Sequence, residues 1–167
     1  MEYDVFFSIS KTPVGDRLPF EAEWAYGARL AGRQELARYG WQGTFPPLGK
    51  SGNYADESAS EIIPVVINGY NDTFAVSAPV ASFPKNPAGF FDLDGNVSEW
   101  CHDYYTPYTP HTGEVAADPT GPESGAHHVV RGASWRDGSI TEVRLSYRGY
   151  SREKRDDIGF RIARYAQ

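Results

Sequence analysis

"GFFDLDGNVSEWCHDYY", residues 89–105, places four acidic side chains among large apolar and aromatic ones. Apolar and aromatic side chains favour burial, whereas a carboxylate resists burial unless it is paired or bound to a cation. On these residues alone two interpretations stay open: a solvated acidic turn, or a loop that holds a positive ion. The four acids are Asp92, Asp94, Glu99 and Asp103.

The rest of the chain has the composition of one loop-rich domain, residues 1–167. A chain of 167 residues is long enough to bury a single hydrophobic core. Seventeen glycines, twelve prolines and 14% aromatic residues favour short elements joined by many turns over a helical bundle. Composition therefore predicts a loop-rich α+β domain.

Charge and cysteine content exclude several classes of protein and site. A net charge of −6 without a basic cluster argues against a nucleic-acid or anionic-membrane partner, because both need a positive surface. No run approaches the roughly 20 apolar residues of a membrane span, and the N-terminal residues lack a signal-peptide pattern. The one cysteine, Cys101, excludes an intrachain disulfide and a cysteine-based zinc site, and we interpret it as a small buried residue.

Local patterns predict one helix and several strands. Residues 18–32 fit a helix with Pro19 at its first turn and Gly32 as its stop. Residues 2–10 are apolar but ambiguous between strand and helix, and residues 106–126 read as a long Pro/Gly/Thr-rich surface loop. The expected strands are 127–135, 142–150 and 159–166.

Four separated motifs give the chain a family resemblance. They are "RLPFEAEWAYGAR" at 17–29, "GFFDLDGNVSEW" at 89–100, "VVRGASW" at 129–135 and "DDIGFRIAR" at 156–164. In this order they resemble the formylglycine-generating enzyme family, also called the sulfatase-modifying factor family, from about Ser10 onward. The resemblance implies a C-type lectin-like fold: a small twisted antiparallel sheet with flanking helices and long loops.

The same resemblance implies that residues 92–99 form a structural calcium site. Asp92 and Glu99 would give side-chain oxygens, and Gly95 and Val97 would give backbone carbonyls. Calcium takes about six to eight oxygen ligands, and a tight glycine-containing turn can direct carbonyls inward. Spacing alone favours an acidic turn without an ion, whereas the resemblance favours calcium.

A second calcium site is implied upstream, in "GNYAD" at 52–56 and "NDTFAVSAPV" at 71–80. The resemblance assigns side-chain oxygens to one residue of each segment and a carbonyl to another. The alternative is two ordinary turns, because Asn and Asp are common turn residues. The implied ligands are Asn53, Tyr54, Asp72 and Phe74.

The chain departs from the family at its catalytic positions. Enzymes of the family oxidise a sulfatase cysteine to formylglycine with a copper-binding cysteine pair just after the RG-SW motif. Here Asp137 and Arg144 lie near the expected positions, and residues 131–150 contain no cysteine. A carboxylate and a guanidinium cannot replace two thiolates that bind soft monovalent copper. We therefore expect no bound copper and lean against enzymatic activity.

The start of the chain is a second departure. Family domains begin well before this helix, whereas about 18 residues precede Leu18 here. Either the chain is a fragment of a longer protein or the fold is pared down. Residues 2–10 could close the sheet by pairing with 159–166, since an exposed edge invites association. Covering of that edge by a second copy, or by other domains of a parent protein, is the alternative.

The sequence-based hypothesis is a non-catalytic, calcium-stabilised module that presents loops to a peptide or protein ligand. An arginine-rich face favours an anionic or carboxylate-bearing partner. The competing view is that nearby acids neutralise these arginines within the fold. The residues expected to line the binding face are Arg136, Asp137, Arg144, Tyr147 and Arg148.

Two alternative functions remain open from the sequence. One is a catalytic family member with altered chemistry, either a protein-modifying oxidase or a part of a non-haem iron enzyme. The other is a variable protein of a diversity-generating retroelement, although the absence of asparagine in residues 131–160 argues against it. The compartment stays open: calcium dependence would suit an exported or cell-surface protein, but the chain shows no signal.

Overall fold

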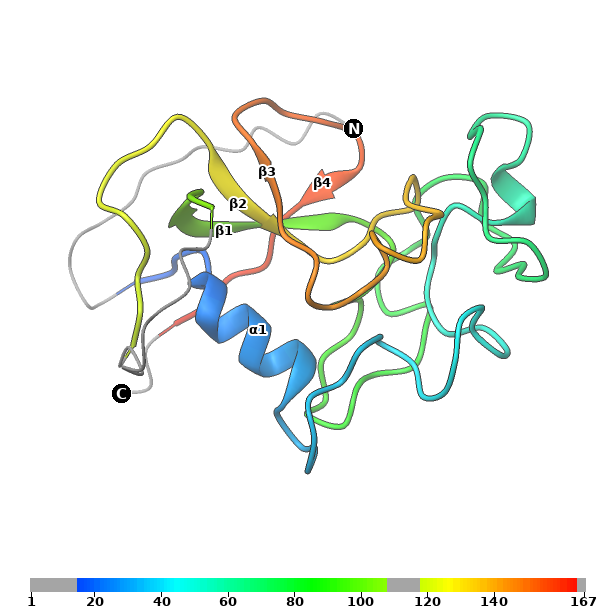
Figure 1. Ribbon diagram of the computed structural model, residues 1–167, viewed down its shortest axis with the longest axis horizontal. Helices are drawn as coiled ribbons and strands as arrows, with labels where there is room; N and C mark the ends of the chain where they lie inside the picture. The colour runs from blue at the N-terminus through cyan, green and yellow to red at the C-terminus, as the bar shows by residue number, and fades with distance from the viewer. Residues whose placement is uncertain (1–14, 108–117, 165–167) are drawn as a thin grey trace.

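The computed structural model describes residues 15–107 and 118–164 (Figure 1). Their regular elements are few and short, and most of the chain between them runs in turns and loops. The predicted segment 2–10 lies outside the described residues. The elements are α1 (Glu21–Arg29), a 3₁₀ turn η1 (Glu57–Ala59), β1 (Ser98–Tyr104), β2 (His128–Arg131), β3 (Gly149–Ser151) and β4 (Ile158–Gly159).

The four strands form one sheet in the order β3-β2-β1-β4. β2 pairs antiparallel with both neighbours, with Trp100 opposite Val130 and Val129 opposite Tyr150, whereas β4 runs parallel to β1. The expected antiparallel sheet is thus a mixed one. The described residues contain one α-helix, α1, instead of several flanking helices.

Helix α1 matches the predicted helix and is shorter at both ends. Its start is fixed by two carboxylates: Glu23 accepts the Phe20 N–H at 2.8 Å, and Asp103 of β1 accepts the Glu21 N–H at 2.7 Å. Trp24 and Ala28 are buried, so this face of α1 packs toward the sheet. They form a core cluster with Leu93, Cys101, Val129 and Leu145. Cys101 is fully buried, as expected from the sequence.

The predicted strand 142–150 is wrong except for its last two residues. Leu145 N–H donates to the Arg38 carbonyl at 2.9 Å, and Val143 N–H donates to Ser139 at 3.2 Å, so this segment makes turn and loop bonds. Val143 and Leu145 are two residues apart and both are buried, but each packs into a different core cluster. Their spacing therefore does not mark one face of a strand. Period-two alternation was therefore misleading here.

The predicted strand 127–135 is shortened, and the predicted strand 159–166 shares only Gly159 with the sheet. In 127–135, only His128–Arg131 pair as β2. In 159–166, the ladder ends at Gly159, and the chain next meets a neighbour at Ala163, which bridges to Arg17.

The loop-rich half, on the right in Figure 1, has its own aromatic core. Tyr39 stacks on Trp41 at 4.5 Å between ring centroids, and Trp41 meets the edge of Tyr54 at 5.5 Å. At Gly138, a side-chain Cβ would lie 2.2 Å from the Val65 carbonyl oxygen, so only glycine permits this close approach. Aromatic packing and close backbone contact thus replace regular structure in this half. Within the described ranges, no helix has the length and apolarity that crossing a membrane requires.

Candidate functional site

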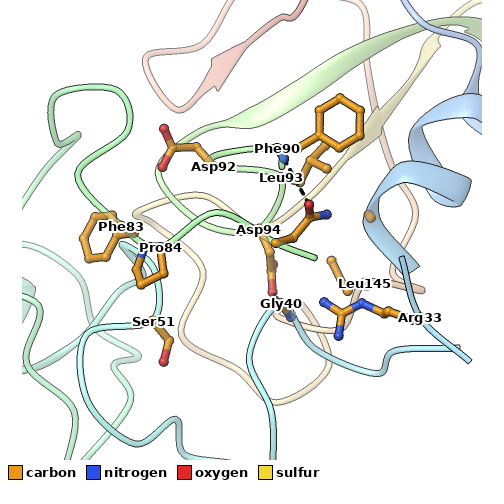
Figure 2. A pocket seen from close by; sticks show the side chains of 12 residues that line it. Arg33, Gly40, Ser51, Phe83, Pro84, Phe90, Asp92, Leu93, Asp94 and Leu145 are labelled. Carbon is orange, nitrogen blue, oxygen red and sulfur yellow. Dashed lines mark hydrogen bonds between the residues drawn. The ribbon is translucent and has the colours of Figure 1, made fainter. Parts of the chain in front are cut away.

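The first expected calcium loop, residues 92–99, holds its two acids in separate interactions. The Asp92 carboxylate accepts the Ala81 N–H at 2.7 Å, and Figure 2 shows it directed away from Asp94. The Glu99 side chain is 6% exposed and forms an ion pair with Arg161, whose Nε donates to it at 2.6 Å. The Trp24 indole also donates to Glu99, at 2.7 Å. Arg161 therefore already compensates the Glu99 charge.

The backbone of this loop is turned sharply by left-handed residues. Asp92, Gly95 and Asn96 have φ of 53°, 93° and 70°. The Asn96 N–H donates to the Asn53 carbonyl at 2.7 Å, and the Gly95 N–H donates to Ala133 at 3.1 Å. The loop thus joins the upstream candidate site to the segment after β2.

Asp94 is an acid of the opening stretch to which the sequence assigned no role. One of its oxygens accepts the Gly40 N–H at 2.7 Å, and the other is buried without a hydrogen-bond partner. Burial raises the pKa of Asp94 to about 7. It lines a cavity of about 30 Å³, whose wall also includes Arg33 and Ser51 (Figure 2). In the sequence, the only sign of this unusual environment was that Asp94 lies among apolar residues.

The second expected calcium site contains an unsatisfied oxygen. Asn53 is fully buried, its amide nitrogen donates to the Val76 carbonyl at 2.9 Å and to Asn96 Oδ1 at 3.3 Å, and its own Oδ1 has no partner. Exchanging the amide oxygen and nitrogen would set the oxygen against two acceptors, so the observed orientation is the favoured one. Asn53 Oδ1 is therefore an acceptor without a donor, which is costly in a buried position.

Two buried carboxylates belong to the same two segments as this expected site. Asp72 accepts the N–H groups of Tyr54 at 3.0 Å and Phe74 at 2.7 Å, and its own N–H donates to the Asp56 carboxylate. Burial raises the pKa of Asp72 to about 6, and the Asp56 charge adds to the effect. Among the described residues, neither acid has a cationic side chain within ion-pair distance. Lys50 reaches the hydroxyl of Thr73 instead, at 3.0 Å.

Thr73 adds backbone strain to the same segment. Its φ is +80°, a left-handed conformation that a β-branched residue rarely adopts. Such a conformation costs on the order of 1–3 kcal/mol and persists only where its surroundings impose it. Asp72 accepts N–H groups from both Tyr54 and Phe74, and Asn53 donates to Val76, so the structure brings the two segments of this expected site together.

Neither of the two expected calcium sites consists only of charged side chains. The part of the chain that the structure describes contains no group of three or more His, Cys, Asp or Glu side chains arranged for a metal ion. Any ion at these loops would therefore depend on amide and carbonyl oxygens, which suit a hard cation such as calcium.

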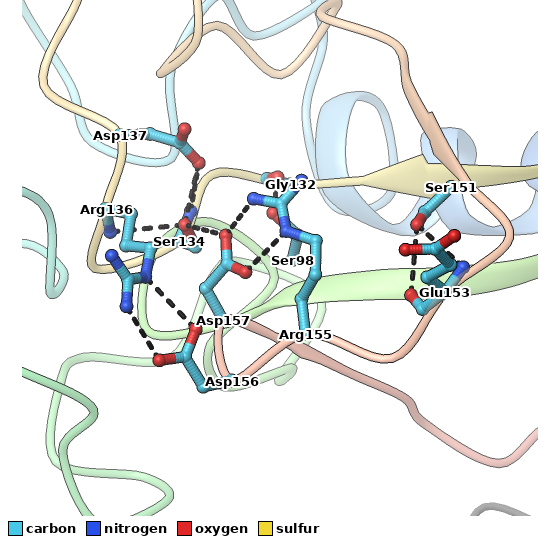
Figure 3. Close-up of polar contacts among 10 residues, drawn as sticks. All are labelled: Ser98, Gly132, Ser134, Arg136, Asp137, Ser151, Glu153, Arg155, Asp156 and Asp157. Carbon is cyan, nitrogen blue, oxygen red and sulfur yellow. Dashed lines mark hydrogen bonds and ion pairs between the residues drawn. The ribbon is translucent and has the colours of Figure 1, made fainter.

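The five residues of the expected binding face divide into two groups, and the first is structural. Arg136 forms two hydrogen bonds with Asp156, at 3.1 and 2.7 Å, and its guanidinium lies 4.2 Å from the centre of the Trp135 ring. Asp137 accepts the Ser134 N–H and hydroxyl at 2.7 and 2.9 Å. Figure 3 shows these contacts in one network after β2. Trp135 is 4% exposed, as expected for a packed tryptophan.

The second group lines a hollow of about 400 Å³. Arg148 is fixed in its wall by Glu21, with bonds of 2.6 and 2.7 Å, and donates to the Thr106 carbonyl. Arg144 differs: its Nε is buried without a hydrogen-bond partner, and no carboxylate of the described chain lies within ion-pair distance. The hollow is lined by Tyr105, Pro107, Thr141, Arg144, Ser146, Tyr147 and Arg148.

Two acidic groups act on Tyr147, one of the residues that line this hollow. Burial raises the pKa of the Tyr147 hydroxyl, and the charges of Glu142 and Asp137 contribute in the same direction. Tyr147 is 41% exposed. The hollow is therefore lined by the cationic Arg144 and by a tyrosine hydroxyl that stays protonated.

Comparison with known proteins places the chain in a family. The family model for the sulfatase-modifying factor enzyme 1-like domain matches residues 9–166. The chain belongs to that family. A formylglycine-generating enzyme of Streptomyces coelicolor is 34% identical over 161 residues, which are 89% of this chain and 46% of that enzyme.

Other relatives of the family domain carry different names. The inactive C-alpha-formylglycine-generating enzyme 2 of Bos taurus is 32% identical over 166 residues, 89% of this chain and 44% of that protein. The serine/threonine-protein kinase pkn1 of Chlamydia caviae is 36% identical over 124 residues, 74% of this chain and 16% of the kinase. Related domains therefore occur within larger proteins.

A solved structure supports the fold. Treponema denticola variable protein 1 aligns with a TM-score of 0.69 and 28% identity, over 89% of this chain and 47% of that one. The chain spans about half the length of the Streptomyces enzyme and of this structure.

Proposed function

We propose that this family domain is a non-catalytic, calcium-stabilised module that binds a carboxylate-bearing ligand, such as an acidic peptide, in the hollow beside Arg144. The observation that carries the proposal is the Arg144 guanidinium, which lines a hollow of about 400 Å³ and has no carboxylate partner among the described residues. A guanidinium recognises a carboxylate through paired, charge-assisted hydrogen bonds. Arg148, already held by Glu21, contributes a fixed wall.

The non-catalytic part rests on the cysteine content. The single cysteine, Cys101, is fully buried in β1, and burial raises the pKa of its thiol. A thiol of this kind cannot act as an accessible thiolate. The segment after the RG-SW motif offers Asp137 and Arg144 where a copper-binding pair would be needed. The Bos taurus relative that is named inactive shows that the family contains members without the activity.

The calcium part is supported most by the upstream site. The Asn53 side chain, the Asp72 carboxylate and the carbonyls of Tyr54 and Phe74 would hold the ion. When bound, calcium would supply positive charge to two buried carboxylates and a partner to Asn53 Oδ1. At the 92–99 loop, with Asp92, Gly95, Val97 and Glu99 as ligands, an ion would have to replace Arg161 at Glu99, so we propose the upstream site as the stronger one.

Matched variants test the calcium proposal and separate the two sites. Calcium at about 100 times its dissociation constant should stabilise the chelator-treated protein by about 2.7 kcal/mol. Asp72→Asn should abolish this calcium-dependent rise in melting temperature, whereas Glu99→Gln should keep it. The proposal fails if the wild-type protein shows no rise, and the site assignment fails if the two variants behave in the opposite way.

The binding proposal is tested by NMR titration of labelled protein. The probes are N-acetyl tetra-aspartate amide and, as the neutral control, N-acetyl tetra-asparagine amide. The aspartate peptide alone should shift the signals of Thr141, Arg144 and Ser146. Arg144→Gln should remove these shifts without lowering the melting temperature, and Arg152→Gln, at a side chain 69% exposed outside the hollow, should keep them. Equal loss in both variants would indicate non-specific charge attraction and would refute the site.

A further inference from the structure

A second hollow adjoins the one beside Arg144. It has a volume of about 210 Å³, and the two share Pro107 and Arg148 in their walls. Its outer wall comes from α1, through Ala22 and Ala25, and from the segment 119–122. The two hollows are therefore neighbours, with Pro107 and Arg148 in the wall of both.

The carboxylates in the second hollow are already occupied by the fold. Glu21 forms ion pairs with Arg131 at 2.9 Å and with Arg148 at 2.6 Å. Asp103 accepts the Glu21 N–H at 2.7 Å. Gly121 lies directly on Asp103, since a Cβ there would be 2.9 Å from the Asp103 Cβ, and this holds segment 119–122 against the end of β1. Both carboxylates of this hollow therefore already accept hydrogen bonds within the fold.

What remains for a ligand in the second hollow is apolar surface. Proline has no N–H, so the part of the wall made by Pro107, Pro119 and Pro122 offers a ligand no backbone donor. Ala22 and Ala25 are half-buried and leave room on the face of α1. This lining favours an apolar side chain over a polar one, because a polar group would lose its water partners there without replacement.

We propose that the two hollows form one groove that binds an extended peptide with an acidic side chain at Arg144 and an apolar side chain between α1 and the 119–122 segment. The first half of this statement rests on the proposed function, and the second half is new. The two hollows differ in chemistry, cationic in one and apolar in the other. The groove therefore selects both the composition and the spacing of the two anchoring residues.

The test uses synthetic peptides with one Asp and one Leu at varied separation in a Gly/Ser background, measured by fluorescence polarisation. Peptides with Asp alone are the reference. At one preferred separation, Leu should tighten binding on the order of tenfold, since it removes an aliphatic side chain from water. Arg144→Gln should remove the dependence on Asp.

Variants in the second hollow separate the two claims. Ala22→Phe should fill that hollow and remove the Leu advantage while Asp-only binding persists, and Ala88→Phe, at an exposed position outside both hollows, should change neither. Pro119→Glu, which leaves the helix intact, should have the same effect as Ala22→Phe. If Leu adds nothing at any separation, or its advantage survives both variants, the groove is refuted while the Arg144 site stands. If no Asp peptide binds, both proposals fail.

Discussion

Glu21→Ala should be among the most destabilising single substitutions at a charged residue of this chain. Glu21 opens α1, and its carboxylate accepts Arg131 at 2.9 Å and Arg148 at 2.6 and 2.7 Å. The three side chains are 11%, 3% and 11% exposed, so solvent barely screens them. The substitution leaves two buried guanidinium groups without their shared carboxylate.

The expected cost follows from that geometry. Breaking a buried ion pair by removing one partner typically costs about 3–5 kcal/mol, since the remaining charge loses its compensation. For a domain of this size, 1 kcal/mol corresponds to roughly 2–4 °C in melting temperature, so a fall of about 10 °C is expected. Because Arg148 lines both hollows, ligand binding should weaken in parallel.

Glu23→Ala is the matched control, two residues further along α1. Glu23 pairs with Arg17 at 2.6 Å, but its side chain is 45% exposed, and exposed pairs contribute about 0–1 kcal/mol. Loss of its bond to the Phe20 N–H adds a further cost of about 1 kcal/mol. Urea unfolding followed by tryptophan fluorescence measures both variants. If Glu21→Ala costs no more than Glu23→Ala, the buried network does not stabilise the fold as argued.

Two further predictions concern pH and catalysis. Burial raises the pKa of Asp94 to about 7, above its unfolded value near 4, so the folded state binds this proton more tightly and stability should fall as pH rises from about 4 to 7. In chelator, Asp94→Asn should remove roughly 3 kcal/mol of that fall between pH 5 and 8, measured by urea unfolding, and an unchanged pH profile would contradict the assignment. A sulfatase-derived peptide with a Cys-x-Pro-x-Arg core, incubated with the protein, copper, oxygen and reductant, should give no aldehyde by mass spectrometry above a protein-free control, because the chain has no cysteine pair.

The sequence predicted α1 well because its signals are local. Proline and acids stand at its start, and Trp24 and Ala28 repeat on one face. The central strand β1 was missed for the opposite reason. All seven of its residues, Ser98–Tyr104, are buried or half-buried whatever their polarity, so no alternation marks it. Its acids are compatible with burial only through partners that lie far away in sequence.

The sequence could predict which residues belong to the candidate sites, but it could not predict which groups each of them would contact. The resemblance named Asn53, Tyr54, Asp72 and Phe74, and the structure brings their two segments together. It also named five binding residues, but no local pattern could distinguish Arg136, which Asp156 holds, from Arg144, which no carboxylate of the described residues holds. That distinction depends on which acid reaches which arginine after the loops fold.

The acids of the opening stretch show how far such pairing extends. Asp92 accepts a backbone N–H 11 residues away, Asp94 one 54 residues away and Asp103 one 82 residues away, whereas Glu99 pairs with Arg161, 62 residues away. Each carboxylate therefore anchors a different segment to β1 and its preceding loop. A stretch used in this way must carry acids among apolar residues whether or not an ion is bound. Arg144 is the converse case: within the described part of the chain no acid pairs with this cation, and for that reason it is the strongest position at which to search for an external acid.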